Sequence, residues 1–357
     1  MIPVFSRYLA SRFATYLAFV LAALSALALT LDLMEEADRV LGSGYGGVSG
    51  LLWYSALRLP DIIGQMLPVA TLLGTIVMLG QLLRHSELVA MWGSGLSPLQ
   101  IMGRLLPLAA VLAVFTFINA DIAVPKSRAL LRAWDVGEAR KTGILADDGR
   151  MAWMLSGTDL VRTPKQAAAF GELDDITVFR RDGDGRLLER IDAARALPQG
   201  EGWLLKEVRR IDVASGAAAV IENLYWDGRI DVAALPLIAS EIRDLGSSQL
   251  LQLIRNRGYG QRPAYRYSTW LQARIAASVV PALMIFLAIA LAQRFRRTGG
   301  FSTLLLSSVG IGFGFLAFDG ITLAMGEAGL VPSWFAAWGA KAALLCLTGA
   351  FIVSREA

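Results

Sequence analysis

Long uncharged stretches alternate with polar stretches along this chain, and their lengths match the thickness of a membrane. A helix that crosses the hydrocarbon core of a bilayer needs roughly 20 mostly apolar residues, because each residue advances it by about 1.5 Å. Five stretches of 16 to 22 uncharged residues, and a sixth from about Leu330 to Val353 that contains one lysine, predict six transmembrane helices. The first five stretches are bounded by Arg12 and Asp32, Asp61 and Arg84, Arg104 and Asp121, Arg274 and Arg294, and Arg297 and Asp319.

Positive charges in the short polar segments predict how these helices are oriented. Short loops that stay in the cytoplasm carry an excess of Lys and Arg. Arg7 and Arg12 lie at the start of the chain, and three arginines separate the fourth and fifth stretches, whereas four acidic residues and only Arg39 follow the first stretch. We therefore expect a multi-pass protein of the bacterial inner membrane with both termini in the cytoplasm. The long segment between the third and fourth spans is then periplasmic.

The polar middle of the chain has the pattern of a β domain. Residues 151–232 contain short apolar runs at intervals of roughly 8 to 12 residues, separated by turns such as Asp182-Gly183-Asp184-Gly185. This spacing is typical of a β-sandwich or jelly roll, and the flanking segments 127–140 and 247–257 are expected to be helical. The predicted organisation is transmembrane helices 1–3 in residues 1–124, a periplasmic all-β jelly-roll domain with helical connectors in residues 125–265, and transmembrane helices 4–6 in residues 266–357.

Composition excludes several classes of protein. A net charge of +4 could suggest nucleic acid, but arginines in cytoplasmic loops account for it, and we expect no nucleic-acid partner. One cysteine and one histidine leave no internal disulfide and no Cys- or His-rich metal site. The phosphate-binding pattern G-x-x-x-x-G-K-[ST] is absent from the sequence. We therefore expect a transport subunit rather than an enzyme, without catalytic residues, metal or a cofactor of its own.

The segment between the second and third spans has the pattern of a short amphipathic helix over residues 86–94. It begins with a serine, a favoured helix N-cap, and two glycines end it. Leu88, Met91 and Trp92 share one face at i, i+3, i+4 spacing, and Glu87 lies at the front. Such a helix could insert its apolar face and a carboxylate into a groove of a cytoplasmic motor. It could equally lie on the membrane surface.

This segment also carries a resemblance to a known family. The residues Ser86-Glu87-Leu88-Val89-Ala90-Met91 and those after them resemble the motif SEL-x-x-M-x-x-x-G-x-S of the LptF/LptG permease family of the lipopolysaccharide-export ABC transporter. The run from Leu67 to Gly74 resembles the P-x-A-x-L-L-G of that family's second helix. Asp32, Pro125 and Asp319 also stand where the family has such residues. The resemblance covers the whole chain and is greatest to the LptG branch.

The resemblance implies a function and a set of partners. The chain would be the permease subunit that extracts lipopolysaccharide from the inner membrane and passes it to a single-span periplasmic bridge protein (LptC-like). It would pair with a homologous permease (LptF-like) and sit on a dimeric cytoplasmic ATPase (LptB-like) that binds the ATP and Mg. The helix at 86–94 would be the coupling helix. Leu88, Met91 and Trp92 would then occupy a groove of the ATPase, and Glu87 would face a basic residue there.

Arginines near the outer ends of the spans are candidates for binding the two phosphates of lipid A. The candidates are Arg39, Arg128, Arg132 and Arg274, each of which could instead anchor its helix at the membrane surface. The family commonly has lysines after the first span, whereas this chain has Glu35-Glu36-Ala37-Asp38. That acidic stretch would repel phosphate unless a divalent cation bridged the two.

Two ionisable residues lie within the last two predicted spans. Asp319 and Lys341 are expected roughly 9 and 14 Å below the outer membrane surface, at similar depth on consecutive helices. Charges inside a membrane are costly and usually face a partner, so we expect a structural ion pair. A proton relay is the alternative, and it would make the protein a proton-coupled secondary transporter. A mechanical or scaffold protein that moves no lipid is a further alternative.

Overall fold

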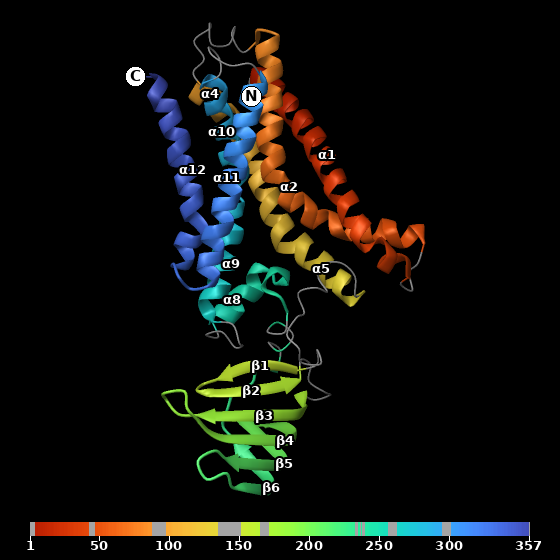
Figure 1. The fold of residues 1–357 in the computed structure, drawn as a ribbon, viewed down its shortest axis with the longest axis vertical. Coiled ribbons are helices and arrows are strands. Elements are labelled where there is room, and N and C mark those ends of the chain that lie inside the picture. Colours follow the sequence, from red (N-terminus) through yellow and green to blue (C-terminus); the bar gives the residue numbers. More distant parts are fainter. Residues whose placement is uncertain are drawn as a thin grey trace. The chain divides into compact units, whose positions relative to one another are not determined.

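The computed structural model describes residues 4–42, 47–87, 98–134, 151–164, 171–232, 235, 237, 240–255, 263–294 and 301–356. The chain divides into two compact units. The first combines residues 1–140 with residues 269–357 and is helical, and the second comprises residues 141–268 and contains the β-sheet (Figure 1). Long apolar runs form the helices of the first unit, and short apolar runs separated by turns form the strands of the second.

Long apolar helices make up the first unit. Five of the described helices are long and apolar enough to cross a membrane, and a bent pair makes a sixth if it is counted as one span. The predicted polytopic helical fold is therefore confirmed. The helices are α1 (Val4–Gly42), α2 (Val48–Arg84), α4 (Pro98–Ile118) with the π-helix η1 (Asn119–Ala123) and α5 (Val124–Ala133), α9 (Ala264–Ala277), α10 (Val280–Arg294), α11 (Phe301–Glu327) and α12 (Ser333–Glu356).

The fourth predicted span differs in shape from a single helix. It consists of α9 and α10, which meet at an angle of 48°. Pro281 has no backbone N–H, so the carbonyl of Ala277 loses its usual helical donor. At the break, the backbone N–H of Ser278 donates to the carbonyl of Ile275 at 3.2 Å, which is a tighter turn than an α-helix. The bend is therefore a consequence of proline at the second residue of α10, the second half of the span.

The third span is extended by a π-helical turn. Residues 119–123 form η1, which joins α4 to α5 without a break. Asn119 at its start donates a hydrogen bond from Nδ2 to the carbonyl of Pro60 in α2, at 2.8 Å. Gly64 leaves room for this contact, since a Cβ there would lie 3.1 Å from Asn119 Nδ2. The π-turn thus allows an amide side chain to bind the backbone of a neighbouring helix.

The core of the helical unit surrounds α10. Its residues from Leu283 to Ala292 are nearly all buried, and α10 contacts α2, α4, α11 and α12. The two hairpin-forming helices α1 and α2 approach closely where Gly74 meets Leu17, because a Cβ on Gly74 would lie 3.0 Å from the Leu17 Cα. Both chain termini lie at the same end of this unit (Figure 1).

The second unit contains a six-stranded antiparallel sheet. Its strands pair in sequence order, each with the next, so the described strands form a meander. The predicted all-β domain inserted between helices is therefore confirmed. The strands are β1 (Met151–Ser156), β2 (Asp159–Pro164), β3 (Leu173–Arg181), β4 (Leu187–Gln199), β5 (Gly202–Asp212) and β6 (Ala218–Trp226), and the helix α8 (Ser247–Arg255) follows them.

Alternation along these strands buries one face of the sheet. Cross-strand pairs such as Met154 with Val161 and Val178 with Ile191 are fully buried, as expected for side chains that point to opposite faces in turn. Trp226 at the end of β6 donates a hydrogen bond from its indole nitrogen to Asp159 at 3.0 Å. Since Asp159 begins β2, the sheet curves enough to bring the end of its last strand back to its first hairpin.

Candidate functional site

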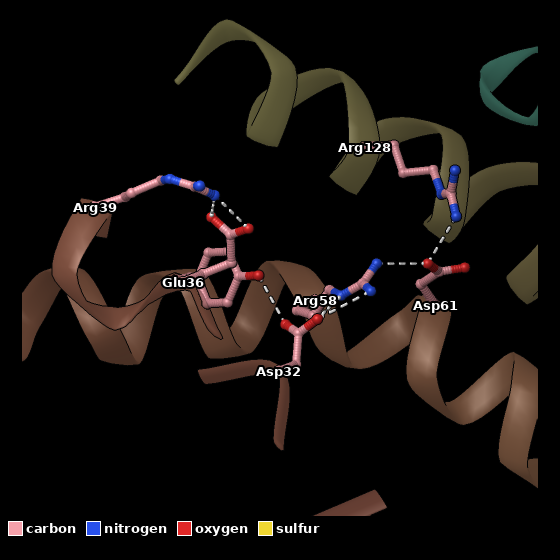
Figure 2. Close-up of polar contacts among 7 residues, drawn as sticks. Asp32, Glu36, Arg39, Arg58, Asp61 and Arg128 are labelled. Atoms are coloured by element: carbon pink, nitrogen blue, oxygen red, sulfur yellow. Dashed lines mark hydrogen bonds and ion pairs between the residues drawn. The ribbon is translucent and has the colours of Figure 1, made fainter. Parts of the chain in front are cut away.

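A buried network of charged residues joins α1, α2 and α5. Asp61 of α2 lies between two arginines, 2.8 Å from Arg58 of the same helix and 2.8 Å from Arg128 of α5 (Figure 2). Arg58 also binds Asp32 of α1 at 3.0 Å, and the Tyr54 hydroxyl donates to the same carboxylate at 2.7 Å. Two carboxylates and two guanidinium groups thus alternate, and three of these four contacts, all but the one between Arg58 and Asp61, connect different helices.

The environment of this network is close to water-free. Arg58, Asp61 and Arg128 are 6%, 8% and 7% exposed. Asp32 lies about 42 Å along α1 from Val4, which exceeds the roughly 30 Å thickness of a hydrocarbon core. The network therefore lies near one membrane surface, at the end of the helical unit opposite the termini. Buried pairs of this kind are costly to break, since removal of one partner leaves the other charge desolvated.

Carboxylates of this chain bind the candidate phosphate-binding arginines Arg39, Arg128 and Arg274. Arg39 lies 2.8 Å from the buried Glu36, and Arg274 lies 3.1 Å from Asp121 of η1. Arg128 binds Asp61, as above. Arg132 lies one turn further along α5 and is half-buried. Arg39 is the most accessible of the three paired arginines, with 48% of its side chain exposed, so it can reach an external anion with the least rearrangement.

Asp61, Arg58 and Asp121 were missed as site residues by reasoning from the sequence, which used Asp61 and Asp121 only as span boundaries. The spacing of Arg58 and Asp61, three residues apart on one helix, is the signal that could have identified the first pair. No comparable local signal connects Asp121 with Arg274, because 153 positions separate them.

Asp319 and Lys341 are brought together by α11 and α12. The ammonium nitrogen of Lys341 lies 2.5 Å from Asp319 Oδ1. Lys341 is only 6% exposed, so its charge is compensated mainly by this carboxylate. An ion pair of this geometry holds two neighbouring helices at a fixed height relative to each other.

The segment after α2 is described only at its beginning. Ser86 has φ of 57°, the left-handed conformation that commonly ends a helix, and Glu87 is the first residue of the next helical turn. The Tyr8 hydroxyl of α1 donates a hydrogen bond to Glu87 Oε2 at 2.9 Å. Leu88, Met91 and Trp92, with the rest of the predicted helix at 86–94, lie outside the described residues.

A stretch of acidic residues follows the first span, and carboxylates are possible metal ligands. Among the residues that the structure describes, no three His, Cys, Asp or Glu side chains lie close enough together to hold a metal ion. The single histidine, His85, has its Nδ1 atom 2.9 Å from the carbonyl of Gln81. Glu36, the buried acid of that stretch, is bound to Arg39.

Comparison with known proteins places these features in a family. The family model described as "Lipopolysaccharide export system permease LptF/LptG" matches residues 7–354. The chain is 24% identical over 310 residues to the lipopolysaccharide export system permease protein LptG of Escherichia coli (strain K12), covering 85% of this chain and 84% of that protein. It is 23% identical over 258 residues to the protein of the same name from Haemophilus influenzae, covering 71% of each.

Proposed function

Because this chain belongs to the LptF/LptG family of lipopolysaccharide export system permeases, we propose that it is the LptG-type permease of an ABC transporter. In this role it extracts lipopolysaccharide from the inner membrane and passes it to a periplasmic bridge. The observation that carries the proposal is the family match over residues 7–354, which includes all the apolar helices and the β unit. Membership makes the chain a transport subunit of lipopolysaccharide export and not an enzyme.

The energy for transport comes from a separate dimeric cytoplasmic ATPase (LptB-like), which binds ATP and Mg. The absence of a phosphate-binding G-x-x-x-x-G-K-[ST] pattern from the sequence supports this division of labour. The segment 86–94 is the coupling helix, with Glu87 facing a basic residue of the ATPase and Leu88, Met91 and Trp92 in its groove. Glu87 lies beside the N-terminal turns of α1, at the end where both termini lie, which we assign to the cytoplasm.

Apolar helix faces support pairing with a homologous permease (LptF-like). Large apolar side chains on α1 are more than half exposed in this chain alone, including Phe19, Leu27 and Leu31, and Leu306, Phe313 and Ile321 of α11 are similarly exposed. In a membrane these faces contact lipid chains, the partner permease or the transported acyl chains. An outward-facing chamber between the two permeases would therefore have apolar walls with arginines at its outer rim.

The β unit is the part suited to contact the single-span periplasmic bridge protein (LptC-like). Among the described strands, β1 and β6 each pair on one side only. An unpaired strand edge can accept a strand from another protein by backbone hydrogen bonding. Lipopolysaccharide released from the membrane would then pass from this domain onto the bridge. The β unit is accordingly assigned to the periplasm.

Co-purification with the candidate ATPase tests the proposal. Wild type and the variants Glu87→Ala and Trp92→Asp are expressed with the partner subunits, and we measure the recovered ATPase together with its rate of ATP hydrolysis. We expect both variants to recover less ATPase or to hydrolyse ATP more slowly, because they remove the charge or the apolar contact. Unchanged assembly and unchanged turnover in both variants would overturn the coupling assignment.

Orientation is tested separately by cysteine labelling. Cys346 is the only cysteine, so a Cys346→Ser background allows single cysteines to be placed at Ser94 or Ser97. A membrane-impermeant maleimide applied to intact spheroplasts should leave both positions unlabelled and should label them after lysis. Labelling before lysis would place this segment in the periplasm and reverse the proposed orientation.

A further inference from the structure

A half-open cleft separates the N-terminal turns of α1 from the end of α2. Its volume is about 120 Å³. The lining includes Tyr8, Arg12 and Tyr16 from α1, and Gln81, His85 and Glu87 from the end of α2 and beyond. The cleft therefore brings a cation, a carboxylate and two phenol groups together at the end where the chain termini lie.

A chain of hydrogen bonds crosses this cleft. Arg12 donates from Nε to the Tyr8 hydroxyl oxygen at 3.2 Å, and the Tyr8 hydroxyl donates to Glu87 Oε2 at 2.9 Å. The guanidinium carbon of Arg12 also lies 5.3 Å from the centre of the Tyr8 ring. Because the phenol oxygen accepts from Arg12, its single proton is left to point at the carboxylate. Hydrogen bonds to an ionised acceptor of this kind are stronger than those between neutral groups.

The position of Glu87 is not set by α2 alone. The helix ends at Arg84, and Ser86 interposes a left-handed residue with φ of 57°. Short-range backbone bonds close the turn, including that from the Ser86 N–H to the Leu83 carbonyl at 3.0 Å. The chain therefore changes direction at Glu87, and a hydrogen bond from the Tyr8 hydroxyl, 79 positions away, orients the Glu87 carboxylate.

The helix α1, which carries Tyr8, is packed against other helices near both of its ends. Next to Tyr8, Leu9 and Phe13 are at most 1% exposed, and Leu17 meets Gly74 of α2. At its other end, α1 contributes Asp32 to the buried network with Arg58. A displacement applied at Tyr8 would therefore be carried toward that network, because Tyr8 and Asp32 lie on one continuous helix.

We propose that Tyr8 is a positioning residue that couples Glu87 to α1, so that movement of the segment beginning at Glu87 is passed directly to the first transmembrane helix. This inference rests on the proposed function, in which that segment contacts the ATPase. Tyr8 holds the carboxylate in place for the ATPase and at the same time ties α1 to it. The first helix then moves with the ATPase and changes the lipid chamber that it lines.

The test uses the complete transporter complex in proteoliposomes and compares Tyr8→Phe with Tyr16→Phe. Both substitutions remove one hydroxyl from the same cleft, but Tyr16 is not part of the hydrogen-bond chain to Glu87 described above. We expect Tyr8→Phe to assemble normally and to move about tenfold less lipid per ATP hydrolysed, the lower end of the effect of losing one hydrogen bond to a charged group. Tyr16→Phe should behave as wild type. Equal lipid yield per ATP in wild type and Tyr8→Phe would overturn the inference.

A double-mutant cycle and a distance measurement separate coupling from a general structural role. Tyr8→Phe should add little to the defect of Glu87→Ala, because the two residues act through one bond, whereas additive defects would contradict the link. In a Cys346→Ser background, spin labels at Ser11 of α1 and Gly103 of α4 should change their separation when a non-hydrolysable ATP analogue binds. The change should be lost in Tyr8→Phe, and its persistence would overturn the proposal.

The two hypotheses fail in distinguishable ways. If Glu87→Ala and Trp92→Asp leave assembly and ATP turnover unchanged, the coupling role of the whole segment fails. If those variants are defective while Tyr8→Phe transports lipid as well as wild type does, the coupling role stands and only the link to α1 is wrong.

Discussion

Arg128 of α5 donates a hydrogen bond to Asp61 of α2 across 2.8 Å, although 67 positions separate the two residues in the chain. The same carboxylate binds Arg58, which in turn binds Asp32 of α1. Three helices are thus joined by one row of alternating charges, close to the membrane surface. Because the row is buried, its strength depends on every member being present.

Neutralising Asp61 should therefore destabilise the helical unit. In Asp61→Asn, Arg58 and Arg128 lose a shared negative charge in a nearly dry site, and we expect a loss of about 3 kcal/mol. The measurement is thermal unfolding of the detergent-solubilised protein followed by tryptophan fluorescence. Asp38→Asn is the matched control, since Asp38 is exposed near the same end of α1. Equal unfolding temperatures for the two variants would contradict the assigned role of Asp61.

The ion pair between Lys341 and Asp319 should behave as a structural contact. Lys341→Met alone leaves a partly buried carboxylate without its cation and should lower the unfolding temperature. The double variant Asp319→Leu/Lys341→Met should recover most of the loss, because a buried pair can often be replaced by apolar side chains of similar volume. Lipid transport by the double variant should persist. Loss of transport despite normal stability would favour the proton-coupled alternative.

The helices α1 and α2 pack so closely at Gly74 that any side chain there should destabilise the protein. A methyl group in Gly74→Ala would lie 3.0 Å from the Leu17 Cα, and neither backbone can move freely, so we expect a destabilisation of about 1–3 kcal/mol. Gly310→Ala is the control, because nothing lies within 4 Å of its added Cβ and alanine favours a helix. Identical unfolding curves for the two variants would show that α1 and α2 do not approach as closely as described.

Asp212 should make one turn of the β unit sensitive to acid. Its carboxylate accepts hydrogen bonds from the backbone N–H and the hydroxyl of Ser215, and these bonds lower the pKa of Asp212 below its usual value. The folded form then binds the proton less readily than the unfolded form does, so the turn's stability is complete above about pH 4 and is lost as the pH falls further. Hydrogen exchange across residues 212–217 measures this. In Asp212→Ala, exchange at neutral pH should be faster than in wild type, and the difference should vanish at low pH.

The more exposed of the candidate arginine side chains should contact lipopolysaccharide more readily. Arg39 has 48% of its side chain exposed, whereas the Arg274 side chain is 6% exposed and bound to Asp121. A photocrosslinking amino acid at position 39 should therefore capture lipopolysaccharide during ATP turnover more efficiently than one at position 274. Adducts are detected by a mobility shift with an antibody to the lipid. No adduct at position 39 would remove Arg39 as a phosphate-binding residue.

Much of the architecture could be predicted from the sequence because the membrane imposes local rules. A spanning helix must satisfy its own backbone hydrogen bonds and present apolar side chains over a fixed length, so the six stretches could be recognised without tertiary information. The β unit was recognisable for a similar reason, since alternation and turn residues are local. The segment starting at Ser86-Glu87 carried enough of a motif to indicate its family.

Contacts between helices were decided only by the tertiary structure. The sequence identified the candidate arginines only as cations at the membrane surface. In the structure, Arg128 of α5 binds Asp61 of α2, and Arg274 of α9 binds Asp121 of η1, because these elements lie side by side. The bend before Pro281 likewise depends on one missing N–H. The apolar content and periodicity of a segment predict a single helix. Which side chains meet on neighbouring helices depends on the rotation of each helix about its axis and on the angle at which the helices cross, and no local pattern of residues encodes either. The link from Tyr8 to Glu87, 79 positions apart, belongs to the same class.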